Sequence, residues 1–203
     1  ADVLVVGELA EDRYVTFFTR QGRVKRLALS EIGSLSGGGV VVGIPEGDSL
    51  LRAFVTTGSQ DLLVITAQGR GLRFKEDEVR PQGRSGSGMR AINLAEGDEV
   101  IGAEALMPES ELIVVSRYGY AKRCPVSEFN TQGRGGQGVL AADPSKHKDA
   151  GLLALSLVAD QGSDVVFVTS GNRMVRRALR EIPALPRASW GRIVTASRKG
   201  AAL

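Results

Sequence analysis

One unit occurs four times along this chain of 203 residues. The copies align on a turn residue, and the successive spacings are 47, 50 and 53 residues from Gly22 to Gly69, Gly119 and Asn172. Asn is, after Gly, the residue that best tolerates a left-handed backbone, so the fourth copy fits the same turn. A repeat of this length is typical of chains in which each unit buries its apolar face against its neighbours, as in solenoids and propellers.

Each turn residue lies between two runs of alternating or β-branched residues, which predicts a hairpin. A further glycine follows each hairpin, then a short apolar strand, and the cycle ends with the runs 50–55, 100–106 and 152–158. Four strands in each of the units 2–48, 49–98, 99–150 and 151–197 predict an all-β, propeller-like single domain over 1–203. The N-terminal run 3–9 is expected to complete the last sheet.

Composition excludes several other classes of protein. Hydrophobic residues make up 42% and charged residues 24%, which allows a buried core and excludes a disordered chain. One cysteine excludes a disulfide scaffold and any multi-cysteine metal site. No apolar stretch reaches the roughly 18 residues of a membrane helix, and no secretory signal is visible, so the sequence predicts a cytoplasmic protein without membrane contact.

An arginine and a glutamate recur at fixed positions in all four units. The glutamates (Glu31, Glu78, Glu128 and Glu181) follow the aligned arginine by five residues. The favoured interpretation is structural: they accept hydrogen bonds from backbone amides at a corner, or they pair with a basic residue of their own unit. The arginines and the bases beside them are expected to line one rim and to bind a polyanion that follows it. These residues are Lys25, Arg26, Arg73, Lys122, Arg123, Arg176 and Arg177.

A second basic series lies in the loop six residues after three of the glutamates, at Arg84, Arg134 and Arg187. Glycines beside these arginines let main-chain amides approach a phosphate closely. The net charge is only +3, yet the region 151–203 carries eight basic and three acidic residues. Such asymmetry favours contact with nucleic acid, although a solvated face is the simpler alternative.

The loop around Arg134 resembles the box of the DNA gyrase A C-terminal domain, with the pattern Gln, base, Arg, Gly, Gly, base, Gly. The resemblance implies a β-pinwheel, in which propeller-like blades exchange strands and duplex DNA wraps around a basic outer edge. Gly133 and Gln137 depart from the pattern, because the family prefers a base at both positions. By resemblance the DNA-binding residues are Gln132, Gly133, Arg134, Gly135, Gly136, Gln137 and Gly138, with Arg84 and Arg187 in the cognate loops.

The same resemblance implies the partners: duplex DNA in the nucleoid, the remainder of a gyrase A-like subunit, and through it the ATPase subunit. In this family the strand-cleaving tyrosine lies in another domain, so the chain is expected to be no enzyme by itself and to need no cofactor or metal. Its role would be to bend or wrap DNA in support of supercoiling. A free-standing paralogue with weaker wrapping and a topoisomerase IV-type subunit stay open.

Two other function classes are compatible with a propeller. A protein-interaction propeller would present an apolar or mixed-charge face, and an enzymatic propeller would need convergent carboxylates, histidines or metal ligands that the sequence does not offer. The unusual single residues favour structural roles. Cys124 is expected in the core, Trp190 is expected to pack against its sheet, and His147 has no second ligand or catalytic partner.

Overall fold

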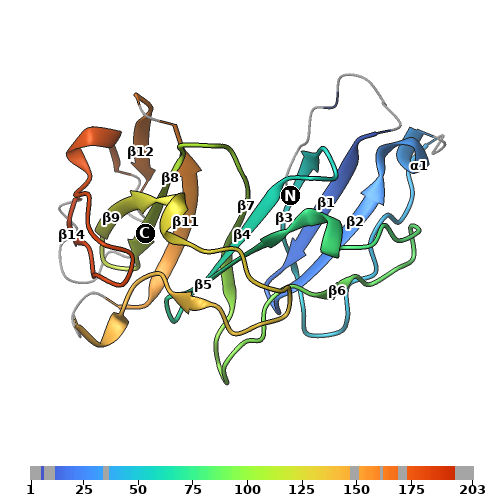
Figure 1. Ribbon diagram of the computed structural model, residues 1–203, viewed down its shortest axis with the longest axis horizontal. Coiled ribbons are helices and arrows are strands. Elements are labelled where there is room, and N and C mark those ends of the chain that lie inside the picture. The colour runs from blue at the N-terminus through green and yellow to red at the C-terminus, as the bar shows by residue number, and fades with distance from the viewer. Residues whose placement is uncertain are drawn as a thin grey trace.

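The computed structural model describes residues 6, 12–33, 37–146, 151–160, 162–168 and 173–194. The regular secondary structure of this part of the chain consists almost entirely of short strands (Figure 1). They are β1 (Tyr14–Thr19), β2 (Arg23–Ala28), β3 (Leu50–Thr56), β4 (Asp61–Thr66), β5 (Arg70–Lys75), β6 (Met89–Arg90), β7 (Val100–Leu106), β8 (Glu111–Ser116), β9 (Tyr120–Pro125), β10 (Val139–Leu140), β11 (Leu153–Ala159), β12 (Asp164–Val168), β13 (Met174–Ala178) and β14 (Arg192–Ile193). The helical segments are α1 (Leu29–Gly33) and the 3-10 turns η1 (Glu76–Glu78), η2 (Val126–Glu128), η3 (Pro144–Lys146) and η5 (Leu179–Glu181).

The four predicted hairpins are present as β1–β2, β4–β5, β8–β9 and β12–β13. In the second hairpin the amide of Gly69, at φ 82°, donates to the carbonyl of Thr66, and the Thr66 hydroxyl accepts a hydrogen bond from the amide of Arg70. The first and third hairpins close in the same way around Gly22 and Gly119. The fourth turn residue, Asn172, lies outside the described residues.

Each of the first three sheets takes strands from two consecutive units. The sheet orders are β3-β1-β2-β6, β10-β5-β4-β7 and β11-β8-β9-β14. The strand β6 follows the second hairpin in sequence but pairs with β2 of the first, and β10 and β14 are exchanged in the same way. This exchange is the β-pinwheel arrangement, and the sheets therefore do not coincide with the units read along the sequence.

The fourth sheet contains β12 and β13 in the part of the chain that the structure describes. The run 3–9, which is expected to complete it, lies outside the described residues except for Val6. Val6 packs against the first sheet, in the cluster of Val15, Phe17 and Leu27.

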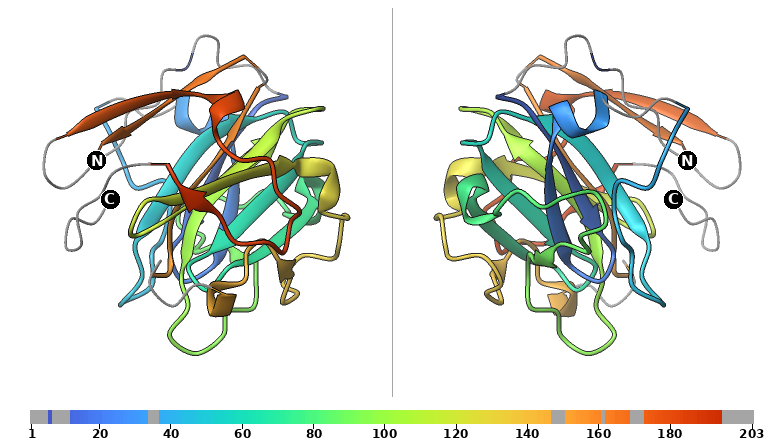
Figure 2. Two further views of the ribbon diagram at one scale, coloured as in Figure 1. Left: turned by 90° about the vertical axis from the view of Figure 1, so that its left-hand side faces the viewer. Right: turned by 90° about the vertical axis from the view of Figure 1, so that its right-hand side faces the viewer.

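The core lies between the sheets, which stack face to face. On β4, Leu62 and Val64 pack with residues of the first sheet, whereas Leu63 and Ile65 pack with residues of the third. A central strand with both faces buried reads as a continuous apolar run, as β4 and β8 do. The first and fourth sheets lie at opposite ends of the longest axis in Figure 1, and Figure 2 shows the molecule from each of these ends.

Candidate nucleic-acid interface

Each of the three four-stranded sheets has an inner and an outer edge. The strand β7 contacts both β3 and β11, so these three strands form the inner edges. The two-residue strands β6, β10 and β14 form the opposite, outer edges. The three box loops, residues 82–88, 132–138 and 185–191, lead directly into these outer strands. The predicted anion-binding loops therefore all lie at the outer edges of the three sheets.

The last glycine of each box is required by close packing. Gly138 has φ 67°, and a Cβ added there would lie 2.5 Å from the carbonyl oxygen of Gly71 on β5. A Cβ on Gly88 would lie at the same distance from the carbonyl oxygen of Val24 on β2. No side chain fits this space, so glycine lets the outer strand join the sheet of the preceding hairpin.

The repeated glutamates fasten these loops. Oε2 of Glu78 accepts a 2.8 Å hydrogen bond from the backbone amide of Arg134, and Oε2 of Glu128 accepts one of 2.7 Å from the amide of Arg187. The interpretation of the glutamates as acceptors for backbone amides is confirmed at these two positions. The structure adds that the amide belongs to the loop of the next unit, more than 50 residues away in sequence.

Two lysines predicted to face DNA are buried instead. Lys25 is 2% exposed, and its ammonium group donates to the carbonyl oxygens of Val41, Gly83 and Arg84 at 2.7–2.8 Å. Lys122 is fully buried and donates to the carbonyl oxygens of Pro186 and Arg187. Burial lowers the pKa of both, that of Lys122 to about 8. Each ammonium group thus holds a box loop and is not available to a phosphate.

Most of the aligned strand arginines bind carboxylates within the protein. Nε of Arg73 donates to Asp61 at 3.0 Å, and Arg123 pairs with Glu111, each across its own hairpin. Both guanidinium groups also reach carbonyl oxygens of the next unit. Arg26 is 7% exposed and lies 4.5 Å from the ring centre of Tyr14. These arginines connect neighbouring sheets and do not form the expected free rim.

The strand β13 carries two exceptions. Arg176 pairs with Asp164, as the other aligned arginines pair, but its side chain is 75% exposed. Arg177 is 44% exposed and lies 4.0 Å from Glu181. Both remain accessible to a ligand.

The box arginines bridge adjacent outer edges. Arg134 donates from Nη1 to the carbonyl oxygen of Arg90 on β6, and Arg187 donates in the same way to Leu140 on β10. Arg187 also lies 5.7 Å from the ring centre of Phe129. Arg84 is exposed. The loop of Arg134, at the outer edge of the second sheet, also contains the other box positions, which are Gln132, Gly133, Gly135, Gly136 and Gln137.

Sequence reasoning missed several exposed arginines near these loops. In the part of the chain that the structure describes, Arg70, Arg90 and Arg192 are exposed on or beside the outer strands, and no ion pair holds their guanidinium groups. The predicted Arg84 is exposed and without an ion pair in the same way. Arg70 borders a surface pocket of about 140 Å³ beside Gln137 of the box. A sequence signal existed, because the residue after the turn glycine is arginine at both position 23 and position 70.

The unusual single residues behave as predicted where they are described. Cys124 is 1% exposed and Trp190 is 6% exposed, so both pack in the core. Burial raises the pKa of the Cys124 thiol to about 11. His147 lies outside the described residues. Over the described ranges, no group of three or more His, Cys, Asp or Glu side chains could hold a metal ion, and no helix is long and apolar enough to cross a membrane.

Stacked hairpin sheets that exchange their outer strands define the β-pinwheel class. The model of the family described as "DNA gyrase C-terminal domain, beta-propeller" matches residues 13–57, 60–106, 110–146 and 163–200. The chain belongs to this family. Its members are non-catalytic domains, and the resemblance drawn from the box is confirmed.

Relatives and solved structures agree with this assignment. The chain is 37% identical over 183 residues to the DNA gyrase A protein of Aminobacterium colombiense, which covers 90% of this chain and 22% of the relative. It is 37% identical over 89 residues to the DNA gyrase A protein of Salmonella typhimurium, covering 43% of this chain and 10% of the relative. The chain thus spans about a fifth or less of the length of these relatives.

Two solved structures share the fold. The C-terminal domain of DNA topoisomerase IV superposes with a TM-score of 0.90 at 22% identity, over 97% of this chain and 62% of that one. The DNA gyrase A C-terminal domain superposes with a TM-score of 0.86 at 20% identity, over 96% of this chain and 65% of that one.

Proposed function

We propose that this chain binds duplex DNA along its outer edge without sequence preference and bends it, as the C-terminal domain of a gyrase A-like subunit. The observation that carries the proposal is the set of exposed arginines without carboxylate partners on or beside the outer edge. Guanidinium groups bind phosphate oxygens well, and each phosphate that they neutralise releases counterions. Contacts to the backbone alone carry no sequence information.

The outer edges of successive sheets follow a curve, which favours binding of a bent duplex over binding of a straight one. Adjacent outer edges are tied together through the bonds from Arg134 to β6 and from Arg187 to β10. A duplex that contacts successive edges must follow the curve of the stack. Bending 20–30 base pairs by 40–90° costs on the order of 1–6 kcal/mol, which several phosphate contacts can offset.

The proposed partners are the DNA of the nucleoid, the ATPase subunit, and the remainder of the gyrase A-like subunit. Gyrase is favoured over topoisomerase IV because the related sequences are DNA gyrase A proteins. In that assembly the domain would act mechanically, by wrapping DNA so that supercoils of one hand are introduced. Its location would be the cytoplasm.

The first experiment measures binding of a fluorescent duplex of about 40 base pairs by anisotropy as a function of salt. The four exposed arginines of the outer edge, Arg70, Arg84, Arg90 and Arg192, each contacting one phosphate, predict a slope of about −3 to −4 for log affinity against log salt. Two duplexes of unrelated sequence should give the same curve. A slope shallower than about −1, or strong preference for one sequence, would contradict the proposal and favour a protein-interaction scaffold.

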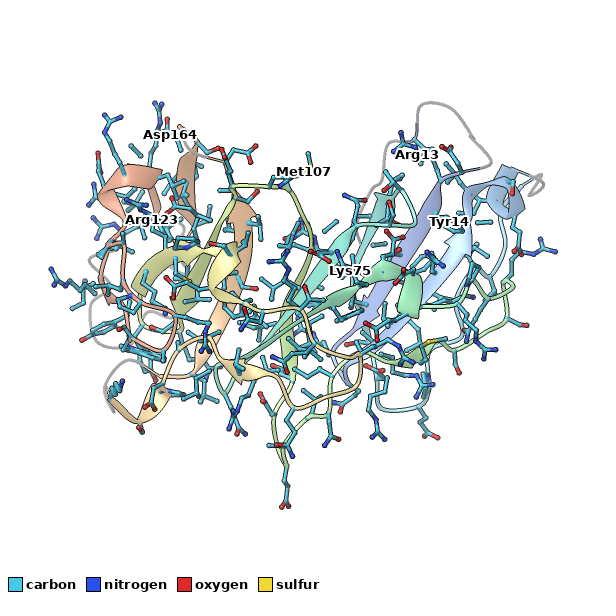
Figure 3. The ribbon with its side chains drawn as sticks, viewed as in Figure 1. Arg13, Tyr14, Lys75, Met107, Arg123 and Asp164 are labelled. Atoms are coloured by element: carbon cyan, nitrogen blue, oxygen red, sulfur yellow. The ribbon has the colours of Figure 1, made fainter. Side chains whose placement is uncertain are left out.

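A pair of double variants locates the interface. Arg84→Gln with Arg192→Gln removes two charges from the outer edge and should make the slope shallower by about 1.8. Arg13→Gln with Lys75→Gln removes two charges at the ends of the hairpins away from the turns (Figure 3) and should change it little. Equal effects of the two pairs would place the DNA elsewhere.

Bending is tested by ligating singly nicked plasmid in the presence of the chain. Wrapped DNA shifts the distribution of topoisomers after the protein is removed. An unshifted distribution at full occupancy would support binding without wrapping, as expected for a paralogue with weaker wrapping.

A further inference from the structure

Two arginines stand directly opposite each other on the outer edge of the first sheet. The antiparallel register of β2 with β6 pairs Arg23 with Arg90. Side chains of directly paired residues project from the same face of a sheet, with Cβ atoms about 5 Å apart, and like charges at such positions are unfavourable. The strand arginines Arg73 and Arg123 have carboxylate partners, whereas in the described ranges no ion pair involves Arg23 or Arg90.

A third guanidinium group joins this pair from the box of the next sheet. Arg134 donates to the carbonyl oxygen of Arg90. A Cβ added to the neighbouring Gly135 would lie 3.9 Å from Cδ of Arg90, so the Arg90 side chain runs beside the box backbone. The amide of Gly135 donates to the carbonyl oxygen of Ala91, which fixes the box against the end of β6. Three cations from two sheets therefore meet at one junction.

Hydrogen bonds to carbonyl oxygens orient two of these cations but do not neutralise them. Arg23 donates from Nε to Ser87 at 2.8 Å and from Nη2 to Gly88 at 3.0 Å, which leaves Nη1 available. Arg134 uses Nε and Nη1 for the carbonyl oxygens of Glu78 and Arg90, which leaves Nη2 available. The carboxylate of Glu78 is nearby, but it accepts the backbone amide of Arg134. An anion is the missing partner.

We propose that Arg23, Arg90 and Arg134 together bind one backbone phosphate of duplex DNA at the junction of the first and second sheets. This inference rests on the proposed function and assigns its strongest phosphate contact. In the sequence, the excess of basic residues in 151–203 favours that region for contact with nucleic acid, and Arg23 and Arg90 lie far from it. A phosphate between the facing arginines relieves their repulsion, and the oriented guanidinium groups of Arg23 and Arg134 lose little freedom on binding it.

The next junction supplies a natural comparison. There Arg70 takes the place of Arg23 and Arg187 that of Arg134, but the residue paired with Arg70 is Leu140. The fold thus accepts leucine at the position of Arg90 in the cognate outer strand. This makes Arg90→Leu a conservative change for the structure and Leu140→Arg a means of building the same three-arginine junction a second time.

The test compares wild type, Arg90→Leu, Leu140→Arg and the control Arg13→Gln in the anisotropy titration with a duplex of about 40 base pairs. Arg90→Leu should weaken binding about tenfold near 0.1 M salt and make the salt slope shallower by about 0.9. Leu140→Arg should strengthen binding and steepen the slope by a similar amount. Arg13→Gln, which removes the same charge from the far end of β1, should change affinity less than about twofold.

The outcomes separate this inference from the proposed function. If wild type fails to bind duplex DNA, the proposed function is wrong. If wild type binds with a steep slope but Arg90→Leu matches Arg13→Gln, only the three-arginine junction is wrong. Thermal unfolding without DNA should show Arg90→Leu no less stable than wild type, since a like-charge pair is removed. If Arg90→Leu unfolds at a lower temperature than wild type, the DNA affinity of Leu140→Arg becomes the deciding measurement. An unchanged affinity of Leu140→Arg overturns the inference.

Discussion

The glycines of the box at residues 132–138 differ in what the fold demands of them, and alanine substitution should rank them. Gly133 has no left-handed backbone, and a Cβ added there meets nothing within 4 Å. Gly135 has φ 82° but its nearest neighbouring atom would be 3.8 Å from the new Cβ. Gly138 combines φ 67° with a contact of 2.5 Å to the carbonyl oxygen of Gly71.

The expected free energies of unfolding follow from these differences. Gly133→Ala should leave stability unchanged or raise it by up to about 1 kcal/mol, because alanine restricts the unfolded chain. Gly135→Ala should cost about 1–2 kcal/mol for the left-handed backbone. Gly138→Ala adds overpacking against backbone that cannot move without shifting β10, for a total of about 2–5 kcal/mol.

Urea denaturation followed by the fluorescence of Trp190 and by circular dichroism measures the three values. Coincident transitions from the two probes are needed for a single free energy. The reasoning would be refuted if Gly138→Ala fell within about 1 kcal/mol of Gly133→Ala, since the close approach of β10 to β5 would then place no demand on the residue.

Three further predictions concern groups that fasten the loops or lie in the core. Glu128→Ala should destabilise the chain by about 1 kcal/mol and Glu128→Gln by less, because an amide oxygen still accepts from Arg187; equal urea midpoints for the two variants would contradict this. Burial lowers the pKa of Lys122 from 10.5 to about 8, so the unfolded chain binds more protons between these values, and stability should rise with pH. Between pH 7 and 9 wild type should gain about 1 kcal/mol relative to Lys122→Met in urea titrations, and a gap that does not widen would argue against a buried ammonium group. The Cys124 thiol, whose pKa burial raises to about 11, should react with a thiol reagent at pH 8 only in urea, and rapid labelling of the native chain would show that the thiol is accessible.

Local features of the sequence were enough to predict the hairpins and their turns. A glycine or asparagine between two β-rich runs specifies a tight turn whatever lies around it, because the turn depends on the dihedral angles of a few residues. The buried positions of Cys124 and Trp190 were predicted on similar grounds, from residue type and the lack of a chemical partner.

The roles of the charged residues could not be predicted in this way. Lys25 and Arg84 look equally basic in the sequence, yet Lys25 is 2% exposed and holds the loop that carries Arg84 in solvent. The carbonyl oxygens that bind Lys25 lie up to 59 residues away. Whether a cation is free for a ligand depends on such distant acceptors, and no local pattern shows them.

The sequence by itself determined the fourfold repeat, the all-β class and the family, because all three depend on residue type and spacing along the chain. Only the tertiary structure decided that β6, β10 and β14 join the sheet of the preceding hairpin. The same exchange brings Arg23, Arg90 and Arg134 together from three units, although the first unit, 2–48, carries five basic and seven acidic residues. Strand pairing over long separations sets which charges meet, and that pairing is a property of the packed sheets.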